Sequence, residues 1–296
     1  MLRGGFGLGA LALGGTVLGG TVLSACGDDG GQTSEATGNL PQNALLAAFP
    51  QGVPHAASGV ATRLPYLLAD KEGVPLSTID GPVTFRVEMD GTQIGDEVEV
   101  EPRDDGVPRA YLPLTFTFPR TGVYDVFATY DGAELDSSIQ IYDRAEIGPP
   151  VVGAPLPAAP TPTTELGLAV NPICTRVPQC PFHAVDLQAA VGQAKPIVLM
   201  VATPAYCQTA VCGPILDNLV DEVGDRTDIT VIHAEVYKNP KDVRDLADAN
   251  LAPLPEAYNL RFEPVMFVTD ASGMLVARAD ITVDRTEMRE LLALAK

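Results

Sequence analysis

The stretch Pro196-Ile-Val-Leu-Met-Val-Ala202 is followed, five residues on, by Cys207-Gln-Thr-Ala-Val-Cys212-Gly-Pro214. The continuous apolar run predicts a strand, and apolar residues at helical spacing after the cysteines predict a helix. Because proline fits the first turn of a helix but disrupts its interior, we expect this helix to begin near Pro214, with both thiols at its N-terminal end. Its apolar face is made of Ile215, Leu216, Leu219, Val220 and Val223.

Helices and strands alternate around this segment, over about residues 166–296. Asp284 and Glu287 have the spacing of a capping box at the start of a last helix, and Asp270-Ala-Ser-Gly273 predicts a hairpin turn. The expected order is strand, helix, strand, helix, strand, strand, helix. The remaining expected elements are a short helix over 186–191, strands over 229–237, 265–269 and 275–281, and a helix after Asn239-Pro240.

This order resembles the thioredoxin fold over nearly all of residues 190–296. Three local matches carry the resemblance: the cysteine pair after the first strand, Phe262-Glu-Pro-Val265 before the next-to-last strand, and the 270–273 hairpin. The resemblance implies that Pro264 is a cis-proline lying against the reactive cysteine. It also implies that Cys207 is the attacking thiolate and Cys212 the resolving thiol. The fold class expected for this part is therefore α/β and thioredoxin-like.

The cysteine pair departs from the thioredoxin pattern. Four residues separate Cys207 from Cys212 instead of two, Tyr206 replaces the active-site tryptophan, and Val201 stands where the family has a buried carboxylate. Residues five apart in a regular helix have Cα atoms about 8–9 Å apart, whereas a disulfide needs less than about 7 Å. Either one cysteine lies outside the helix, or the segment unwinds on oxidation. An inert structural bridge is the alternative to redox activity.

A second cysteine pair lies in Cys174-Thr-Arg-Val-Pro-Gln-Cys180-Pro-Phe-His183. Four cysteines outside the N-terminal segment allow three pairings, and the short spacings favour Cys174 with Cys180 and Cys207 with Cys212. We therefore expect a structural disulfide between Cys174 and Cys180, and no metal or cofactor. The alternative is that these two thiols and His183 bind copper or zinc. His233, within an expected strand, is expected to be a packed histidine.

Residues 44–145 predict an all-β sandwich. Val83-Thr-Phe-Arg-Val-Glu-Met89 alternates apolar and polar residues with period two, and turn residues separate it from similar runs at 112–118, 124–130 and 139–142. The segment Phe118-Pro-Arg-Thr-Gly-Val-Tyr124 resembles a corner of immunoglobulin-like domains in which a tyrosine hydroxyl bonds back to the chain. We expect a spacer or protein-interaction module, with ligand binding as the alternative. Residues 146–165 are proline-rich and predict an extended linker to the second domain, 166–296.

The N-terminus predicts export. Residues 1–25 have one positive charge and a glycine-rich apolar stretch, as in a signal peptide. Leu23-Ser-Ala-Cys26 resembles the lipobox of bacterial lipoproteins, which implies lipidation of Cys26 and anchoring at the outer face of the cytoplasmic membrane. Residues 26–43 would then be a flexible tether. The alternative is an ordinary cleaved signal.

These features predict a membrane-anchored, extracytoplasmic thiol–disulfide oxidoreductase. Its partners would be exported thiol or disulfide proteins and a membrane electron donor or acceptor. The net charge of −19 disfavours nucleic acid as a partner. Three alternatives remain. The first is a thiol peroxidase, although Thr203 stands four residues before Cys207 instead of three. The second is a copper chaperone resembling SCO-type proteins, although no histidine follows His233. The third is a non-catalytic scaffold.

Overall fold

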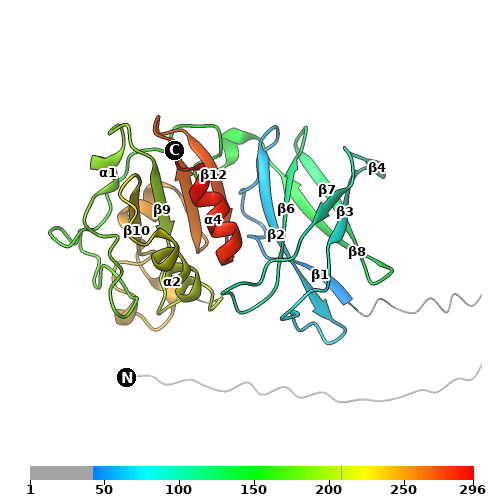
Figure 1. Ribbon diagram of the computed structural model, residues 1–296, viewed down its shortest axis with the longest axis horizontal. Helices are drawn as coiled ribbons and strands as arrows, with labels where there is room; N and C mark the ends of the chain where they lie inside the picture. The colour runs from blue at the N-terminus through cyan, green and yellow to red at the C-terminus, as the bar shows by residue number, and fades with distance from the viewer. Residues whose placement is uncertain (1–42, 208) are drawn as a thin grey trace, which may run out of the picture. The chain divides into compact units, whose positions relative to one another are not determined.

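Three β-sheets make up most of the regular structure in the computed structural model, which describes residues 43–207 and 209–296 (Figure 1). The protein is thus β-rich with few helices, and the described residues belong to one compact unit. The expected signal peptide, Cys26 and all of the expected tether except Asn43 lie outside the described residues. Within that described part, no helix is both long and apolar enough to cross a bilayer.

Two antiparallel sheets form the N-terminal half. Their inner faces share one apolar core, whose large members include Tyr66, Phe85, Leu112 and Tyr124. The first sheet has the order β1-β2-β6 and the second β4-β3-β7-β8, with β5 also pairing with β3. The strands are β1 (Asn43–Ala47), β2 (Ala61–Asp70), β3 (Val83–Met89), β4 (Thr92–Gln93), β5 (Val98–Val100), β6 (Leu112–Thr117), β7 (Gly122–Tyr130) and β8 (Ala133–Ile141).

Side-chain alternation explains which of these strands the sequence predicts. In β3, Val83, Phe85 and Val87 are buried and the residues between them are only partly so, as period two requires. The expected strands at β3, β6, β7 and β8 are all present. Strand β2 was not expected, because Pro65 interrupts its apolar run and proline weakens a strand signal.

The corner at Tyr124 is formed as the resemblance implied. The Tyr124 hydroxyl donates to the carbonyl of Arg120 at 2.9 Å and accepts from the Arg120 N–H at 3.3 Å. The side chain is fully buried, so these bonds satisfy its hydroxyl inside the core.

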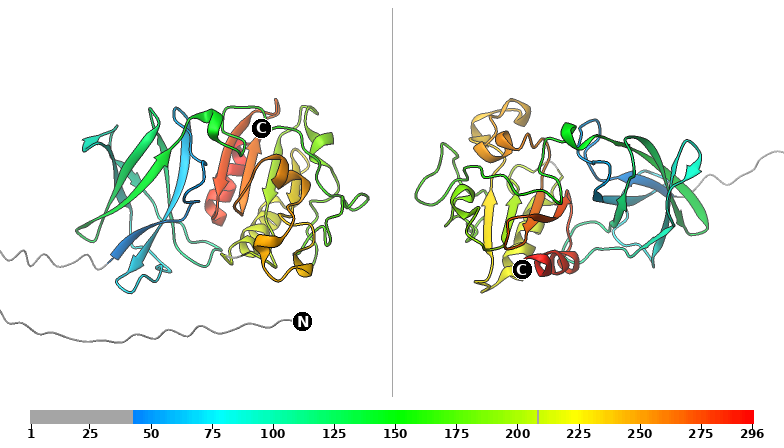
Figure 2. Two further views of the ribbon diagram at one scale, coloured as in Figure 1. Left: turned by 180° about the vertical axis from the view of Figure 1, so that it is seen from behind. Right: turned by 90° about the horizontal axis from the view of Figure 1, so that it is seen from above.

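The third sheet has the order β10-β9-β11-β12 (Figure 2). Strand β9 pairs parallel with β10 and antiparallel with β11, which pairs antiparallel with β12. Every residue of β9 is buried, because helices α2 and α4 pack on one face and α1 and α3 on the other. The elements are β9 (Ile197–Val201), β10 (Thr230–Ala234), β11 (Val265–Thr269), β12 (Leu275–Asp280), α1 (Leu187–Ala190), α2 (Cys212–Val223), α3 (Pro253–Ala257) and α4 (Arg285–Leu294).

Two expected helical features differ in the structure. The chain after Asn239 forms only 3₁₀ turns at Pro240–Asp242 and Leu246–Asp248, so the helix expected there is wrong. At α4, the Asp284 side chain accepts from the Glu287 N–H at 2.7 Å, as expected. The Glu287 carboxylate does not return to the cap. It accepts instead from the Arg63 guanidinium and from the Tyr111 hydroxyl, each at 2.5 Å, which ties α4 to the N-terminal sheets.

The proline-rich segment 146–165 packs against the third sheet instead of standing free. The Leu156 N–H donates to the Gly273 carbonyl at 2.9 Å, and the Leu275 N–H donates to the Ala154 carbonyl at 2.8 Å. Leu156 and Ala159 are buried in the core of the C-terminal half. The segment is extended, as proline predicts, and lies at the edge of the sheet, where a missing N–H costs no ladder bond. The domain boundaries stay a prediction.

Candidate functional site

Cys207 and Cys212 form a disulfide at the start of α2, the pairing expected from their spacing. Helix α2 begins at Cys212, and Cys207 lies in the loop before it, so the Cα–Cα distance is 6.0 Å. Of the two geometric alternatives, the structure therefore has one cysteine outside the helix. The Cys212 side chain is fully buried, whereas Cys207 is partly exposed. An incoming thiol can reach only the Cys207 sulfur.

Glu263 lies on the buried side of this disulfide. Its Oε2 accepts the Thr203 N–H at 2.5 Å and lies 3.6 Å from Cys212 Sγ. Burial raises the pKa of the Glu263 carboxyl to about 7, although the Thr203 N–H bond opposes the rise. The carboxyl therefore exchanges its proton near neutral pH, next to the Cys212 sulfur.

Glu263 is not predicted from the sequence, because the thioredoxin pattern has its buried carboxylate at the position of Val201, in β9. The glutamate comes instead from the loop before β11, immediately ahead of Pro264. The Glu263–Pro264 peptide bond is cis, and Pro264 is buried. A glutamate next to the expected cis-proline was the signal available in the sequence.

An apolar groove of about 470 Å³ borders the loop between Cys207 and Cys212. Thr209 and Val211, on either side of Ala210 in the Cys207–Cys212 loop, and Phe262 line one part of it. Phe49 and Pro108, from the N-terminal half, line another part. The groove thus reaches the loop that joins Cys207 to Cys212.

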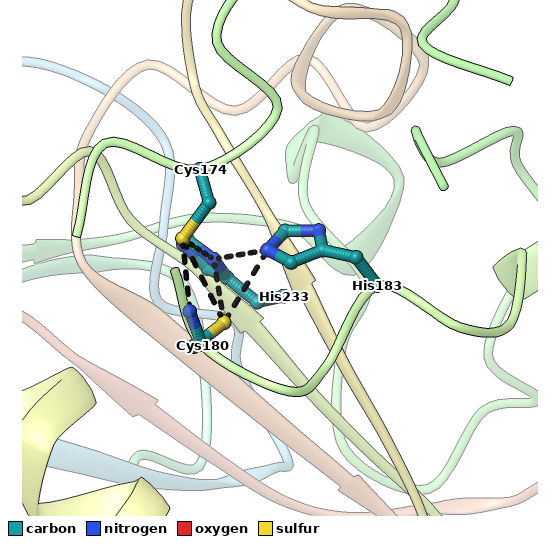
Figure 3. Close-up of side chains that lie close together, drawn as sticks. All are labelled: Cys174, Cys180, His183 and His233. Atoms are coloured by element: carbon teal, nitrogen blue, oxygen red, sulfur yellow. Dashed lines mark hydrogen bonds between the residues drawn. The ribbon is translucent and has the colours of Figure 1, made fainter. Parts of the chain in front are cut away.

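The second cysteine pair lies in a buried cluster of two thiols and two imidazoles (Figure 3). Cys174, Cys180 and His183 come from the loop before α1, and His233 is the last residue but one of β10. The predicted Cys174–Cys180 disulfide is not formed. Both thiols are free, and their Sγ atoms lie 3.8 Å apart, well beyond the ~2.05 Å of an S–S bond.

The four side chains turn one atom each toward a common centre, and these atoms all lie within 4.8 Å of one another. Cys180 Sγ is 3.3 Å from His183 Nε2 and 3.4 Å from His233 Nδ1. Cys174 Sγ is 3.7 Å from His233 Nδ1, and the two imidazole nitrogens are 3.2 Å apart. His233, expected as a packed histidine, therefore belongs to the cluster. Its 50-residue separation from His183 hid it from any search for local spacing.

Hydrogen bonds outside the cluster fix its orientation. The far nitrogen of His233, Nε2, lies 2.9 Å from the Ala202 carbonyl, to which only an N–H can donate. This leaves an unprotonated Nδ1 facing the thiols. The Cys180 N–H donates to Cys174 Sγ at 3.5 Å. The hydrogen bond between the Cys174 and Cys180 side chains lowers the pKa of the Cys174 thiol.

Thr175 links this cluster to the disulfide loop. The N–H and hydroxyl of Thr175 donate to the buried carboxyl of Glu235 at 2.5 and 3.2 Å. Its hydroxyl also accepts the Ala205 N–H at 3.2 Å, two residues before Cys207. Burial raises the pKa of Glu235 to about 8, so this carboxyl is mostly protonated and neutral at pH 7.

No family model and no curated protein matches the sequence. Among solved structures, the C-terminal domain of ZirS is 14% identical, with a TM-score of 0.24 over 43% of this chain and 86% of that one. A Titin M10–Obscurin-like 1 Ig complex is 20% identical, with a TM-score of 0.21 over 34% of this chain and 92% of that one. The match to an engineered protein, 17% identical with a TM-score of 0.24, covers 34% of this chain and 20% of that one. Similarities this weak carry no argument about fold or function.

Proposed function

We propose that the protein is a membrane-anchored, extracytoplasmic thiol–disulfide oxidoreductase whose exchanging pair is Cys207 and Cys212. The observation that carries the proposal is the asymmetry of the pair. One sulfur is accessible, the other is buried, and the buried one lies 3.6 Å from a carboxyl whose pKa is raised to about 7. An inert bridge needs neither the exposure nor the carboxyl.

We propose that the C-terminal half is thioredoxin-like, and its sheet topology supports this. The strand order β10-β9-β11-β12, with one parallel pair and a closing hairpin, and the cis bond before Pro264 fit the resemblance drawn from the sequence. We propose that the N-terminal sheets form an immunoglobulin-like spacer or protein-interaction module. Lipid on Cys26 would hold the protein at the outer face of the cytoplasmic membrane.

The exchange begins when the Cys207 thiolate of the reduced protein attacks a substrate disulfide. The Cys207–substrate S–S bond forms, the substrate S–S bond breaks, and one substrate sulfur leaves as a thiolate. The start of α2 stabilises negative charge on sulfur through its free N–H groups and its dipole. We expect only Cys207 to attack substrate, because it is the partly exposed cysteine of the pair.

The resolving step uses Glu263. Its carboxylate takes the proton of the Cys212 thiol, and the Cys212 thiolate attacks Cys207 Sγ. The Cys207–Cys212 bond forms as the mixed disulfide breaks, and the second substrate thiolate leaves. Two electrons have then passed from the protein to the substrate, and the reverse sequence oxidises a substrate dithiol. A partner dithiol or disulfide protein at the membrane restores the starting state.

The groove beside the disulfide is suited to an extended segment of a protein substrate. Its lining at Val211 and Phe262 is apolar, so it would hold apolar side chains flanking the substrate cysteine. A charged small thiol such as glutathione would gain little from this surface. Exchange should therefore be faster with unfolded cysteine-containing proteins than with glutathione alone.

A redox titration tests the proposal. The soluble chain without residues 1–26 is equilibrated with glutathione buffers, and the bonded thiols are identified by mass spectrometry. Exchange catalysts titrate between about −120 and −270 mV, and we expect the Cys207–Cys212 bond in that range. If this bond resists reduction below roughly −300 mV, it is structural and the oxidoreductase proposal fails.

A further inference from the structure

The buried cysteine–histidine cluster has the dimensions of a tetrahedral metal site. With zinc–sulfur bonds of about 2.3 Å and zinc–nitrogen bonds of about 2.0–2.1 Å, tetrahedral angles place sulfurs about 3.8 Å apart and nitrogens about 3.3 Å apart. A sulfur and a nitrogen are then about 3.6 Å apart. The corresponding distances here are 3.8 Å between sulfurs, 3.2 Å between nitrogens, and 3.3, 3.4 and 3.7 Å for three of the four sulfur–nitrogen pairs. The fourth pair, Cys174 Sγ and His183 Nε2, lies within 4.8 Å.

The hydrogen-bond inventory also calls for a cation at this centre. Because the proton of His233 is on Nε2, its Nδ1 turns a lone pair inward, toward both sulfurs and His183 Nε2. Buried acceptors need donors, and the four converging atoms carry at most three protons, those of the two thiols and that of His183, whose Nδ1 has no partner. A single metal ion satisfies all four at once. The Cys180 N–H aimed at Cys174 Sγ is the hydrogen bond that a metal-bound thiolate accepts.

We propose that Cys174, Cys180, His183 and His233 bind one Zn²⁺ ion in a closed, structural site. Tetrahedral coordination by two sulfurs and two nitrogens is diagnostic of zinc among the single ions that bind such ligands. Two thiolates neutralise the double positive charge, which matters because all four side chains are buried. On binding, each thiol proton still present leaves to solvent and a Zn–S bond takes its place. Four protein ligands leave no open position for catalysis.

The site would fasten the 171–183 loop to β10 and support the approach to Cys207. His233 bonds the Ala202 carbonyl at the end of β9, and Thr175 bonds the Ala205 N–H. Both hydrogen bonds fall on the segment that leads from β9 to the disulfide. The proposal does not depend on redox activity, since a structural zinc site stands whether or not Cys207 exchanges.

The test uses full-length protein purified without added metal, whose zinc content is measured by inductively coupled plasma mass spectrometry. Cobalt replacing the zinc then reports geometry through its visible absorption. The chain supplies a matched control for each ligand type. Cys180→Ser is compared with Cys207→Ser, and His183→Asn with His55→Asn, since His55 lies in the N-terminal half, bonded to the Val53 carbonyl. Circular dichroism checks folding of each variant.

We expect one zinc per chain in the wild type and in both controls. Cobalt should give the intense spectrum of tetrahedral thiolate coordination. Cys180→Ser and His183→Asn should weaken zinc binding at least ~10-fold in competition with a chelator. Should a ligand variant fail to fold, the wild-type chelator titration and cobalt spectrum still decide the matter. A Cys174–Cys180 disulfide in the purified protein that binds no zinc after reduction would overturn the proposal. So would copper in place of zinc, or loss of zinc from the controls.

Discussion

The two cysteine pairs of this protein have almost the same spacing along the chain and different surroundings in space. Cys207 and Cys212 are joined at the start of a helix, one sulfur partly exposed and the other near a carboxyl. Cys174 and Cys180 are free thiols, both buried and facing two imidazoles. A thiol near an exchangeable proton and solvent is suited to exchange, whereas buried thiols among imidazoles are suited to a metal. The surroundings of the cysteines, and not their spacing along the chain, are the basis on which we propose different chemistry for the two pairs.

Replacing the accessible cysteine should have the largest effect. Cys207→Ser should reduce disulfide exchange with a protein substrate to the uncatalysed rate, because no other sulfur of the pair is exposed. Cys174→Ser should keep exchange well above that rate. The assay is reduction of an unfolded disulfide protein, followed by alkylation. Equal losses of exchange rate in the two variants would contradict the proposal that only the Cys207–Cys212 pair carries out exchange.

Removing the metal should be the next largest effect, and it should act on stability. Zinc present at 1,000 times its Kd adds about 4 kcal/mol to the free energy of unfolding, which corresponds to a fall of roughly 10 °C in Tm when a chelator removes it. Thermal melts with and without chelator measure this. The double variant Cys207→Ser/Cys212→Ser serves as control and should respond to chelator as the wild type does. A chelator-insensitive Tm argues against a structural metal.

Changing the carboxyl beside Cys212 should have opposite effects on rate and stability. Glu263→Gln should slow the resolving step by ~10²-fold, the usual size of a general-base contribution. The folded-state pKa of about 7 lies above the ordinary 4.5, so the folded protein binds this proton more tightly than the unfolded chain does. Stability from this group is therefore full below pH 4.5 and falls as the pH rises to 7. Glu263→Gln should remove that fall and stabilise the protein at pH 8 by about 3 kcal/mol.

Stopped-flow alkylation measures the resolving step, and urea unfolding at pH 5 and pH 8 measures the stability. The wild type should lose stability relative to Glu263→Gln between these two pH values. If Glu263→Gln changes neither the rate of the resolving step nor the pH dependence of stability, Glu263 has no part in the exchange. Zinc content should be the same in both proteins, since Glu263 does not contact the cluster.

Cutting the link between the two pairs should have the smallest effect. Thr175→Val keeps the backbone N–H that bonds Glu235 and removes the hydroxyl that accepts the Ala205 N–H. Stability should fall by about 1–2 kcal/mol, while the zinc content stays the same. Thr115→Val, at an exposed position in β6, is the matched control and should change stability by less than about 0.5 kcal/mol. Loss of zinc from Thr175→Val would show that the link is part of the metal site.

The sequence predicted best where one local period decides the structure. Strand β3 and helix α4 follow from alternation and from the Asp284 cap. The segment after Asn239 was predicted wrongly, because proline at a helix start is a local signal. Residues 241–251 are exposed or only partly buried, so packing does not stabilise a helix there. Strand β2 was hidden by Pro65, whose cost is offset by packing on both sides.

Of the candidate sites, the Cys207–Cys212 pairing followed from spacing, but its partners did not. Glu263 reaches Cys212 from a loop 51 residues further along the chain. The cluster was predicted in part, because a metal bound by Cys174, Cys180 and His183 was one of the alternatives. The fourth side chain, His233, could be found only once β10 was known to lie beside the loop that holds the other three. Spacing along the sequence favoured a disulfide between Cys174 and Cys180. It shows that two thiols are close together, but it does not show the imidazoles that face them in the folded protein.

The most direct test of the proposal that one cysteine pair exchanges disulfides and the other binds zinc measures both pairs in one sample. Zinc-loaded protein is titrated with glutathione buffers, its four cysteines are mapped by differential alkylation, and its zinc is counted at each potential. We predict that Cys207 and Cys212 pass from thiols to a disulfide between about −270 and −120 mV, while zinc stays bound and Cys174 and Cys180 stay unmodified. If Cys174 and Cys180 instead become disulfide-bonded over the same range with loss of zinc, or if Cys207 and Cys212 never open, the account is contradicted.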